Sequence, residues 1–330
     1  MSLAFSFYRD EDENAWDQFI LEKSMNGLFL QTRKFINYHA KNKFKDCSVI
    51  VRKGNEIVAL VLACEIYDEN KKVFFAHKGT TFGGISIAKS IYSASAIEEL
   101  MEGLISFIKS ESFDKIYLKM VPIIYQKSNT ELLDYFLYKC GFNQYSELNY
   151  YIDIHDMKSE EDILSNFTSN KRRDYRYSLK NDLEFKQLNT RQEIEEYYEV
   201  LQSNLKKLNL PSVHSLQDLY DLKFNRFDEK IEFYGVYYKD KIIAGSMIFC
   251  FNDDIIHTQY LSSNEEYLNL FPMDFLIFNL IKIAVDKGKK TFSFGICTEN
   301  QGRYLNLGLS RFKEGFGTSF CINKSYEKNL

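Results

Sequence analysis

Residues 289–317 read KKTFSFGICTENQGRYLNLGLSRFKEGFG, and this stretch decides the fold of the chain. The segment Thr291–Ile296 is apolar and rich in β-prone residues, so it predicts a buried strand. The spacing of apolar residues in Arg303–Leu309 predicts a short helix that ends near Gly308. Glycines flank an aromatic residue in Phe312–Gly317, which indicates backbone at unusual dihedral angles or close to a ligand.

Length and composition indicate an ordinary globular protein with two domains. The chain has 330 residues, enough for two domains that each bury a core of their own. Its net charge of -4 argues against a protein whose whole surface grips nucleic acid, so we expect no DNA partner. A local basic patch remains compatible with this charge.

The sequence also predicts a cytoplasmic protein without resident metal or cofactor. No apolar run reaches the roughly 18 residues of a membrane span, and the first residues do not form a basic region followed by an apolar one. The six cysteines are widely spaced without a CxxC pair, which indicates neither a zinc site nor a disulfide scaffold. We expect buried free thiols, with a nucleophilic Cys297 as the less favoured alternative.

The two halves of the chain repeat one order of predicted elements. Residues 235–251, GVYYKDKIIAGSMIFCF, align with the strands around Val51, and Ala244 falls on Ala59 in the same register. In both halves a strand meander is followed by a helix, a strand and a second helix, as for residues 95–110, 115–120 and 129–140 of the first half. The crossover helix implies a parallel neighbour for the strand that follows it, so the fold class is α/β with mixed sheets.

The C-terminal motif resembles that of a known family. The pattern FGxxTENxGxxLxxGLxxFKxxFG is similar to the C-terminal signature of the Fem family of non-ribosomal peptidyl transferases, which are built on GNAT-like acyltransferase domains. The resemblance implies two tandem GNAT-like domains: residues 1–150 on the acceptor side and residues 151–317 on the donor side. It also implies that the last strand, within residues 318–330, returns to complete the first domain.

The resemblance assigns a catalytic role to Lys313. The lysine of the family's FK pair is thought to stabilise the charge that develops when an amine attacks an activated carbonyl, and such stabilisation is a large term in acyl transfer. The alternative is a lysine that caps a strand or pairs with a carboxylate. Phe312 beside it is expected to be a core residue or, less favoured, a substrate contact. Glu299 follows the predicted strand and is either a general base or, somewhat better favoured, a helix N-cap.

A basic segment, NKRRDYRYSLK, covers residues 170–180. Arg172, Arg176 and Lys180 are spaced by four and predict one face of a helix, with Lys171 and Arg173 beside them. The family has a similar basic helix at the start of its second domain. These cations therefore either bind the phosphates of a nucleotide, coenzyme or tRNA, or form a solvated face, and the two readings have equal weight.

Three further residues are candidates for substrate binding. His257 and Tyr260 lie on opposite faces of a predicted strand, and a buried histidine is the favoured reading of His257. The family's early FxQSxxWxxxK segment, whose lysine contacts a nucleotide-linked peptidoglycan precursor, reads here as Phe29–His39. Phe35 replaces the tryptophan and His39 the lysine, which weakens the expectation of a peptidoglycan precursor as the acceptor.

These observations predict an enzyme that transfers an acyl or aminoacyl group to an amine of a sugar or cell-envelope precursor. We expect an acyl-CoA or acyl carrier as the co-substrate that donates the group, and a small-molecule or nucleotide-linked acceptor. A close alternative is a Fem-type peptidyl transferase that uses aminoacyl-tRNA in peptidoglycan synthesis, because residues 261–274, LSSNEEYLNLFPMD, contain no glycine for a GNAT pyrophosphate turn. A GNAT-like binding protein without catalytic activity is a further alternative.

Overall fold

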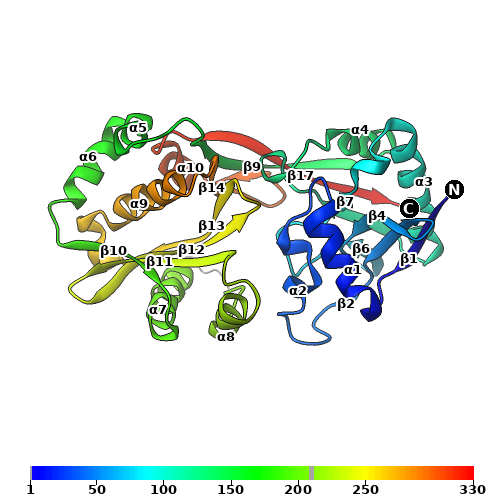
Figure 1. Ribbon diagram of the computed structural model, residues 1–330, viewed down its shortest axis with the longest axis horizontal. Helices are drawn as coiled ribbons and strands as arrows, with labels where there is room; N and C mark the ends of the chain where they lie inside the picture. Colours follow the sequence, from blue (N-terminus) through cyan, green and yellow to red (C-terminus); the bar gives the residue numbers. More distant parts are fainter. Residues whose placement is uncertain (1, 208–211) are drawn as a thin grey trace. The chain divides into compact units, whose positions relative to one another are not determined.

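The computed structural model describes residues 2–207 and 212–330 (Figure 1). Contacts within the chain divide it into two compact units, which are described separately below. Unit 1 comprises Met1–Glu147, Asn300–Arg303 and Ile322–Leu330. Unit 2 comprises Leu148–Glu299 and Tyr304–Cys321.

Unit 1 contains two sheets. One is antiparallel with the strand order β1-β3-β4-β7, and the other has the order β17-β8-β6-β5-β2. The strands are β1 (Leu3–Phe7), β2 (Lys45–Asp46), β3 (Val49–Lys53), β4 (Glu56–Val61), β5 (Cys64–Asp68), β6 (Lys71–Phe75), β7 (Ile85–Ile87), β8 (Lys115–Lys119) and β17 (Ser319–Asn329). The apolar run of residues 57–66 is divided between the two sheets. The chain leaves one sheet after Val61 and joins the other at Cys64.

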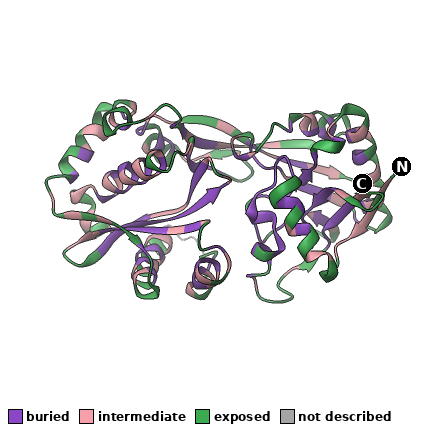
Figure 2. Ribbon diagram, in the orientation of Figure 1, coloured by how far each residue is buried: buried purple, intermediate pink, exposed green. Residues whose placement is uncertain are grey.

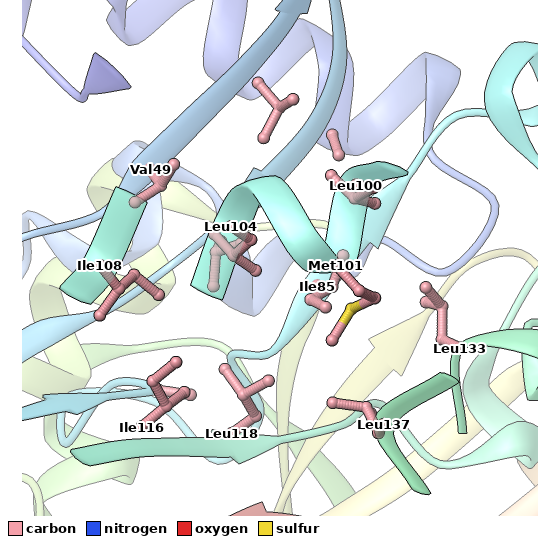
Figure 3. Close-up of a cluster of buried hydrophobic side chains, with 14 of the residues drawn as sticks. Val49, Ile85, Leu100, Met101, Leu104, Ile108, Ile116, Leu118, Leu133 and Leu137 are labelled. Atoms are coloured by element: carbon pink, nitrogen blue, oxygen red, sulfur yellow. The ribbon is translucent and has the colours of Figure 1, made fainter. Parts of the chain in front are cut away.

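The helices of unit 1 are mostly short. They are α1 (Glu13–Gln18), α2 (Arg33–Ile36), α3 (Ala94–Ser110) and α4 (Glu131–Lys139), with the 3-10 turns η1 (Asp10–Asp12), η3 (Phe29–Gln31), η4 (Lys89–Ile91) and η5 (Ile123–Tyr125) and the π-helical η2 (Phe19–Lys23). The apolar residues of α3 recur every three or four positions, so one face of this helix is buried. Figure 3 shows Leu100, Met101 and Leu104 of α3 packed with Leu118 of β8 and Leu137 of α4.

The strands of unit 2 are hydrogen-bonded in the order β10-β11-β12-β13-β14-β9, and the parallel pair is β13 with β14. The strands are β9 (Asn143–Asp153), β10 (Leu183–Leu188), β11 (Ile231–Tyr238), β12 (Lys241–Phe251), β13 (Ile255–Ser263) and β14 (Thr291–Ile296). The counterpart of the broken strand in unit 1 is β12, which runs through all its residues in one sheet.

Helices of unit 2 cover this sheet, and strand β12 in its interior is buried in nearly all its residues (Figure 2). They are α5 (Glu160–Asn166), α6 (Ser169–Ser178), α7 (Arg191–Lys207), α8 (Leu216–Tyr220), α9 (Pro272–Asp286) and α10 (Leu307–Glu314), with the π-helical η6 (Asp221–Arg226) and the 3-10 helix η7 (Glu265–Leu270). A buried cluster joins α9 to the sheet through Leu276, Leu280 and Ile281 on the helix and Phe292 and Phe294 on β14.

The helix predicted over residues 303–309 is wrong in its position. A two-stranded hairpin of β15 (Thr298–Glu299) and β16 (Tyr304–Leu305) stands there instead, and α10 begins after it. Asn300 and Gln301 have φ angles of 48 and 54, the left-handed values that a tight hairpin turn requires. Consequently Gly308 lies in the first turn of α10 rather than at a helix end, and Phe312 and Lys313 are helical.

The last strand of each half pairs outside its own half of the sequence. Strand β9 follows α4 in the chain, yet its residues Asn149–Asp153 pair with β14 of unit 2. Strand β17 follows α10, and its residues Ser325–Asn329 pair with β8 within unit 1. The parts of the two strands thus complete the sheets of different units.

Candidate active site

Lys313 holds the end of strand β14. Its side chain is only 4% exposed in spite of its charge. The ammonium donates to the carbonyl oxygens of Phe294, Gly295 and Ile296 at 2.9, 3.0 and 2.8 Å. Burial lowers the pKa of Lys313 below its ordinary range, and the neighbouring Cys297 thiol opposes this shift.

The place that Lys313 occupies is the point where two parallel strands diverge. Strand β13 pairs with β14 only from Ile255 to His257, and within the described residues this pairing stops at Ser293 although β13 continues to Ser263. In β12, Met247 pairs with Tyr260 of β13 and Ile248 pairs with Thr258. Gln259 between them has no partner in β12, so it is the extra residue of a β-bulge. We call this place the β13–β14 divergence.

His257 and Gly295 form the floor of the β13–β14 divergence. His257 is buried, and its Nδ1 lies 3.3 Å from Ser293 Oγ, which also accepts the Gly295 N–H at 3.2 Å. Burial and the nearby Lys313 charge lower the pKa of His257 to about 3, so its ring is neutral. Gly295 has φ 72, and a Cβ there would lie 3.2 Å from the His257 ring. Glycine therefore suits both the backbone and the space.

A hydrogen-bonded network that sequence patterns did not reveal lies beside Lys313. The Tyr150 hydroxyl is 2.5 Å from Ser310 Oγ, and the hydroxyls of Tyr150 and Ser310 donate to Glu314 Oε1 at 3.2 and 2.9 Å. The Tyr150 ring centre is 5.9 Å from the Lys313 ammonium. Ser310 and Glu314 are spaced by four on α10, which is a helical signal, but nothing in the sequence relates them to Tyr150.

Glu299 and Tyr260 have different surroundings. Glu299 is exposed in β15, and the helix that follows is capped by Asn306, whose side chain accepts from the Leu309 N–H at 3.0 Å. The N-cap prediction for Glu299 is therefore wrong. Tyr260 Oη lies 2.6 Å from Nδ1 of His214, and burial raises the pKa of this tyrosine.

The basic segment does form helix α6, but its cations do not share one face. Lys171 is turned inward and pairs with Asp274 of α9 at 2.7 Å, where burial raises the pKa of the aspartate. Arg172 donates to the Phe167 carbonyl at 2.8 Å and so caps the end of α5. Arg173 pairs with its neighbour Asp174, and Arg176 is exposed.

The end of α6 explains another difference from the prediction. The helix stops at Ser178, so Lys180 lies beyond the last turn instead of extending a row of three cations. At the other end, Thr168 binds the Gly315 carbonyl through both its N–H and its hydroxyl, at 2.9 and 3.1 Å. Helix α6 is thereby fixed to the end of α10.

The aromatic and glycine residues on either side of Lys313 take part in the packing of α10 against α5 and α6. Phe312 is half-buried, whereas Phe316 is buried, and the Lys171 ammonium lies 4.6 Å from the Phe312 ring centre and 4.7 Å from that of Phe316. A Cβ at Gly315 would lie 2.8 Å from the Lys171 side chain, and Gly317 has φ 77 against Asn166. The motif is therefore explained by close packing of α10 against α5 and α6.

The first turn of α9 carries no anion-binding features. Pro272 occupies the first position and has no N–H to offer, and the buried carboxylate of Asp274 lies in the same turn. Two glutamates, Glu265 and Glu266, precede it in η7. A helix N-terminus that binds pyrophosphate needs free N–H groups and no negative charge beside them. Here Pro272 removes one N–H group, and Asp274 adds a negative charge.

His39 lies in unit 1, in a cavity of about 560 Å³. Its Nε2 donates to the Gly79 carbonyl at 2.8 Å, and Lys43 approaches Nδ1 at 3.4 Å. His77, in the same cavity, accepts the Gly79 N–H on Nδ1 at 2.9 Å, and burial lowers its pKa to about 4. Neutral His77 therefore carries its proton on Nε2.

Arg33 also lines this cavity and has not been anticipated from the sequence. It is 1% exposed, ion-paired with Asp46, and lies 3.5 Å above the Tyr8 ring and 4.1 Å above that of Trp16. Its Nε and Nη2 are buried without a hydrogen-bond partner. Such nitrogens are costly to leave unpaired, and the guanidinium instead contacts the faces of the Tyr8 and Trp16 rings.

The place in unit 1 that corresponds to the β13–β14 divergence is closed by the chain itself. Strands β6 and β8 are parallel and pair over three residues, ending at Phe75 and Tyr117. Beyond these pairs, the glycine-rich loop of residues 78–86 replaces β6 as the partner of β8, because the Gly83 N–H donates to the Lys119 carbonyl at 3.2 Å. Gly84, at φ 62, lies so close that a Cβ would be 2.8 Å from the same carbonyl.

Two features are absent from residues 2–207 and 212–330. No cluster of three or more histidine, cysteine, aspartate or glutamate side chains there has the arrangement of a metal site. In the same part of the chain, no helix combines the length and apolar character needed to cross a membrane.

Comparisons with known proteins agree with this fold. Residues 165–314 match the family described as Acetyltransferase (GNAT) domain. No curated protein matches the sequence.

Solved structures that resemble the chain over nearly its whole length share little sequence with it. The crystal structure of FemX has a TM-score of 0.70 at 12% identity, covering 99% of this chain and 97% of that one. L-PGS from Bacillus licheniformis has a TM-score of 0.60 at 13% identity, covering 97% and 92%. A tandem GNAT protein from the clavulanic acid biosynthesis pathway has 0.57 at 7% identity, covering 99% and 98%.

The matched domain includes β13, α9, β14 and all of α10, which together form the β13–β14 divergence and carry Lys313. The predicted resemblance and fold class are therefore confirmed: the chain has the fold of FemX and of a tandem GNAT protein, and residues 165–314 match an acetyltransferase (GNAT) domain.

Proposed function

We propose that this protein transfers an aminoacyl group from aminoacyl-tRNA to an amine, with the activated ester bound at the β13–β14 divergence. The observation that carries the proposal is the buried Lys313 ammonium at the vertex of the two strands. A positive charge in a site of low polarity stabilises a nearby oxyanion far more than it would in water.

The reaction needs few groups from the protein. The acceptor nitrogen attacks the ester carbon, the carbonyl oxygen becomes an oxyanion, and the bond to the ribose oxygen then breaks while that oxygen takes the proton lost by the amine. Strand β13 keeps its partner β12 as far as Ser263 but loses β14, so main-chain amides on its free edge are available as oxyanion donors.

Lys313 acts in this scheme mainly as a positioning residue. All three of its hydrogens are bound by the carbonyls of Phe294, Gly295 and Ile296, so a direct bond to the oxyanion requires the exchange of one of them. Without that exchange, the lysine fixes the end of β14 and supplies charge over a longer distance.

The first turn of α9 favours an RNA-linked donor over acyl-CoA. Pro272 and Asp274 take the positions where a coenzyme pyrophosphate would need N–H groups and no negative charge. The names of two similar structures, FemX and L-PGS, are consistent with the same choice. Acyl-CoA, expected from the sequence, is therefore the less favoured donor.

The cavity of unit 1 supports a polar acceptor. Its volume of about 560 Å³ suits a small molecule, and its lining brings Arg33, His39 and His77 together with Asp46. The cations of this lining, Arg33, Lys41 and Lys43, favour an acceptor that carries a carboxylate or phosphate besides its amine. A sugar or cell-envelope precursor, nucleotide-linked or free, meets this requirement.

The test is a transfer assay with two labelled donors. The protein is incubated with a tRNA pool charged with labelled amino acids, or with labelled acyl-CoAs, together with an extract of envelope precursors. We expect label to pass from tRNA to the precursor fraction with the wild type and not with Lys313→Met. Transfer from acyl-CoA alone would overturn the choice of donor, and transfer at an equal rate by Lys313→Met would overturn the site.

A further inference from the structure

Helix α6 presents an exposed basic and aromatic face on unit 2. Its residues are Arg173, Arg176 and Tyr177 on the helix, Lys180 just after it, and Phe271 at the start of α9. We call this set the α6 face. Tyr177 is 43% exposed and stacks on Phe271 with ring centres 5.7 Å apart and an interplanar angle of 28°. The Lys180 ammonium lies 5.0 Å from the Tyr177 ring centre.

The α6 face is distinct from the structural side of the same helix. Lys171, Arg172, Tyr175 and Ser178 are turned to the interior or to α5, as their contacts with Asp274, Phe167 and Phe278 show. The cations of the α6 face therefore contribute nothing to that packing, and a solvated face alone does not require an exposed tyrosine stacked on a second ring.

Apolar and charged neighbours define the surroundings of the α6 face. Leu179 and Leu268 beside it are 55% and 50% exposed. The acids next to it in sequence are Asp174, which is paired with Arg173, and the exposed Asp182. Arg176 and Lys180 thus keep a local positive charge on an acidic protein, next to an aromatic surface.

The α6 face also lies along the route between two elements of the proposed donor site. At its beginning, α6 is bound to Gly315 at the end of α10 through Thr168, two residues from Lys313. At its end, Asn181 donates to the Leu270 carbonyl at 3.5 Å, just before α9. Figure 1 shows α6 beside α9 in unit 2. A chain bound on this face would therefore lead from the start of α9 towards the helix that carries Lys313.

We infer that the α6 face binds the single-stranded 3′ end of an RNA donor. Arginine and lysine neutralise backbone phosphates, while an exposed ring stacks with a base regardless of sequence. Acidic proteins or peptides would satisfy the cations but would leave the exposed part of the Tyr177–Phe271 pair without a further planar partner. The inference rests on the proposed function, because it names the part of the molecule that holds the aminoacyl-tRNA.

The test measures RNA binding rather than transfer. A fluorescent RNA stem with a four-nucleotide single-stranded 3′ end, and the same stem with a blunt end, are titrated with the full chain at several salt concentrations. Four variants are compared with the wild type: Arg176→Glu with Lys180→Glu, Tyr177→Ala, Tyr177→Phe, and the control Lys239→Glu with Lys241→Glu. The two control lysines are exposed cations in unit 2 at the turn between β11 and β12.

The expected results separate charge from stacking. The double charge reversal on α6 should weaken binding of the overhang RNA at least tenfold and flatten the salt dependence by about 1.4 in log–log slope, about 0.7 for each lost phosphate contact. Tyr177→Ala should weaken it about fivefold or more, whereas Tyr177→Phe, which keeps the ring, should bind as the wild type does. The control pair should retain most of the affinity, and the blunt stem should bind less tightly than the overhang RNA.

The outcomes distinguish this inference from the proposed function. Wild-type binding to the overhang RNA that survives all α6 variants would overturn the inference while leaving an RNA-linked donor in place. Equal losses in the α6 and control pairs would also overturn it, since only total charge would then count. Failure of the wild type to bind either RNA at low salt would overturn both. Circular dichroism of each variant establishes that unit 2 remains folded.

Discussion

Replacing Lys313 by methionine should destabilise unit 2 by about 2–4 kcal/mol. The change keeps the length of the side chain but removes the three hydrogen bonds to Phe294, Gly295 and Ile296. Hydrogen bonds to a charged group contribute about 1.5–3 kcal/mol each, so the gross loss is about 5–9 kcal/mol. This loss is offset by several kcal/mol, because burying the ammonium of lysine costs desolvation free energy that burying a methionine side chain does not.

Urea unfolding followed by two probes tests this value. The chain's one tryptophan, Trp16, belongs to unit 1, so its fluorescence shows whether unit 1 is still folded, while circular dichroism reports on the whole chain. The matched control is Lys290→Met, which breaks an exposed ion pair with Asp254 and should change stability by under about 1 kcal/mol. If Lys313→Met were no less stable than this control, Lys313 would not hold β14, and its proposed role would fail.

Three further predictions concern the surroundings of both sites. Lys171→Met should destabilise unit 2 by about 3–5 kcal/mol because it leaves Asp274 buried without a partner, and the double variant with Asp274→Leu should recover most of this loss in denaturant titrations; an additive double variant would contradict the pairing. His77, with a pKa of about 4 when folded and 6.5 when unfolded, binds fewer protons in the folded chain between these values, so stability should fall by up to about 3 kcal/mol as the pH drops from 6.5 to 4. His77→Asn, which can still accept the Gly79 N–H, should reduce this slope in unfolding curves across that range, and an unchanged slope would show that His77 is not neutral. Gly79→Ala should displace His39 and Phe44, which a Cβ would meet at 2.6 and 2.8 Å, and cost about 1–3 kcal/mol, whereas Gly308→Ala in α10 has space and should be neutral or slightly stabilising in thermal melts; equal effects of the two would refute the crowding at Gly79.

The repeat and the C-terminal motif were sufficient to predict the fold. The order of strands and helices can be predicted from the local spacing of apolar residues. The same spacing occurs in both halves of this chain, so the prediction for one half supports that for the other. The strand at Thr291–Ile296 and the helix that became α3 were found in this way. The break between β4 and β5 was not, because Leu62 and Ala63 are as buried and apolar as the strands that they separate.

The partners of the charged residues could not be predicted from the sequence. Lys171 and Arg172 are adjacent to exposed cations of the same type, and nothing local distinguishes an arginine that caps α5 from one that faces solvent. The distinction depends on Phe167 and Asp274, which tertiary packing brings to the helix. The same reason applies to Glu314, since its link to Tyr150 joins residues far apart in the chain.

The duplicated architecture also explains why one unit, and not both, is proposed to bind the donor. Parallel strands that diverge after three pairs leave main-chain groups to be satisfied, and the two units solve this problem differently. Unit 1 uses main chain, because the Gly83–Gly84 turn donates to β8 and needs glycine to approach so closely. Unit 2 uses the side chain of Lys313, which satisfies the carbonyls of β14 and adds a buried positive charge. A side chain can shift to exchange one hydrogen bond for an oxyanion, whereas a loop bonded along the strand cannot, and this difference favours unit 2 as the place of the chemistry.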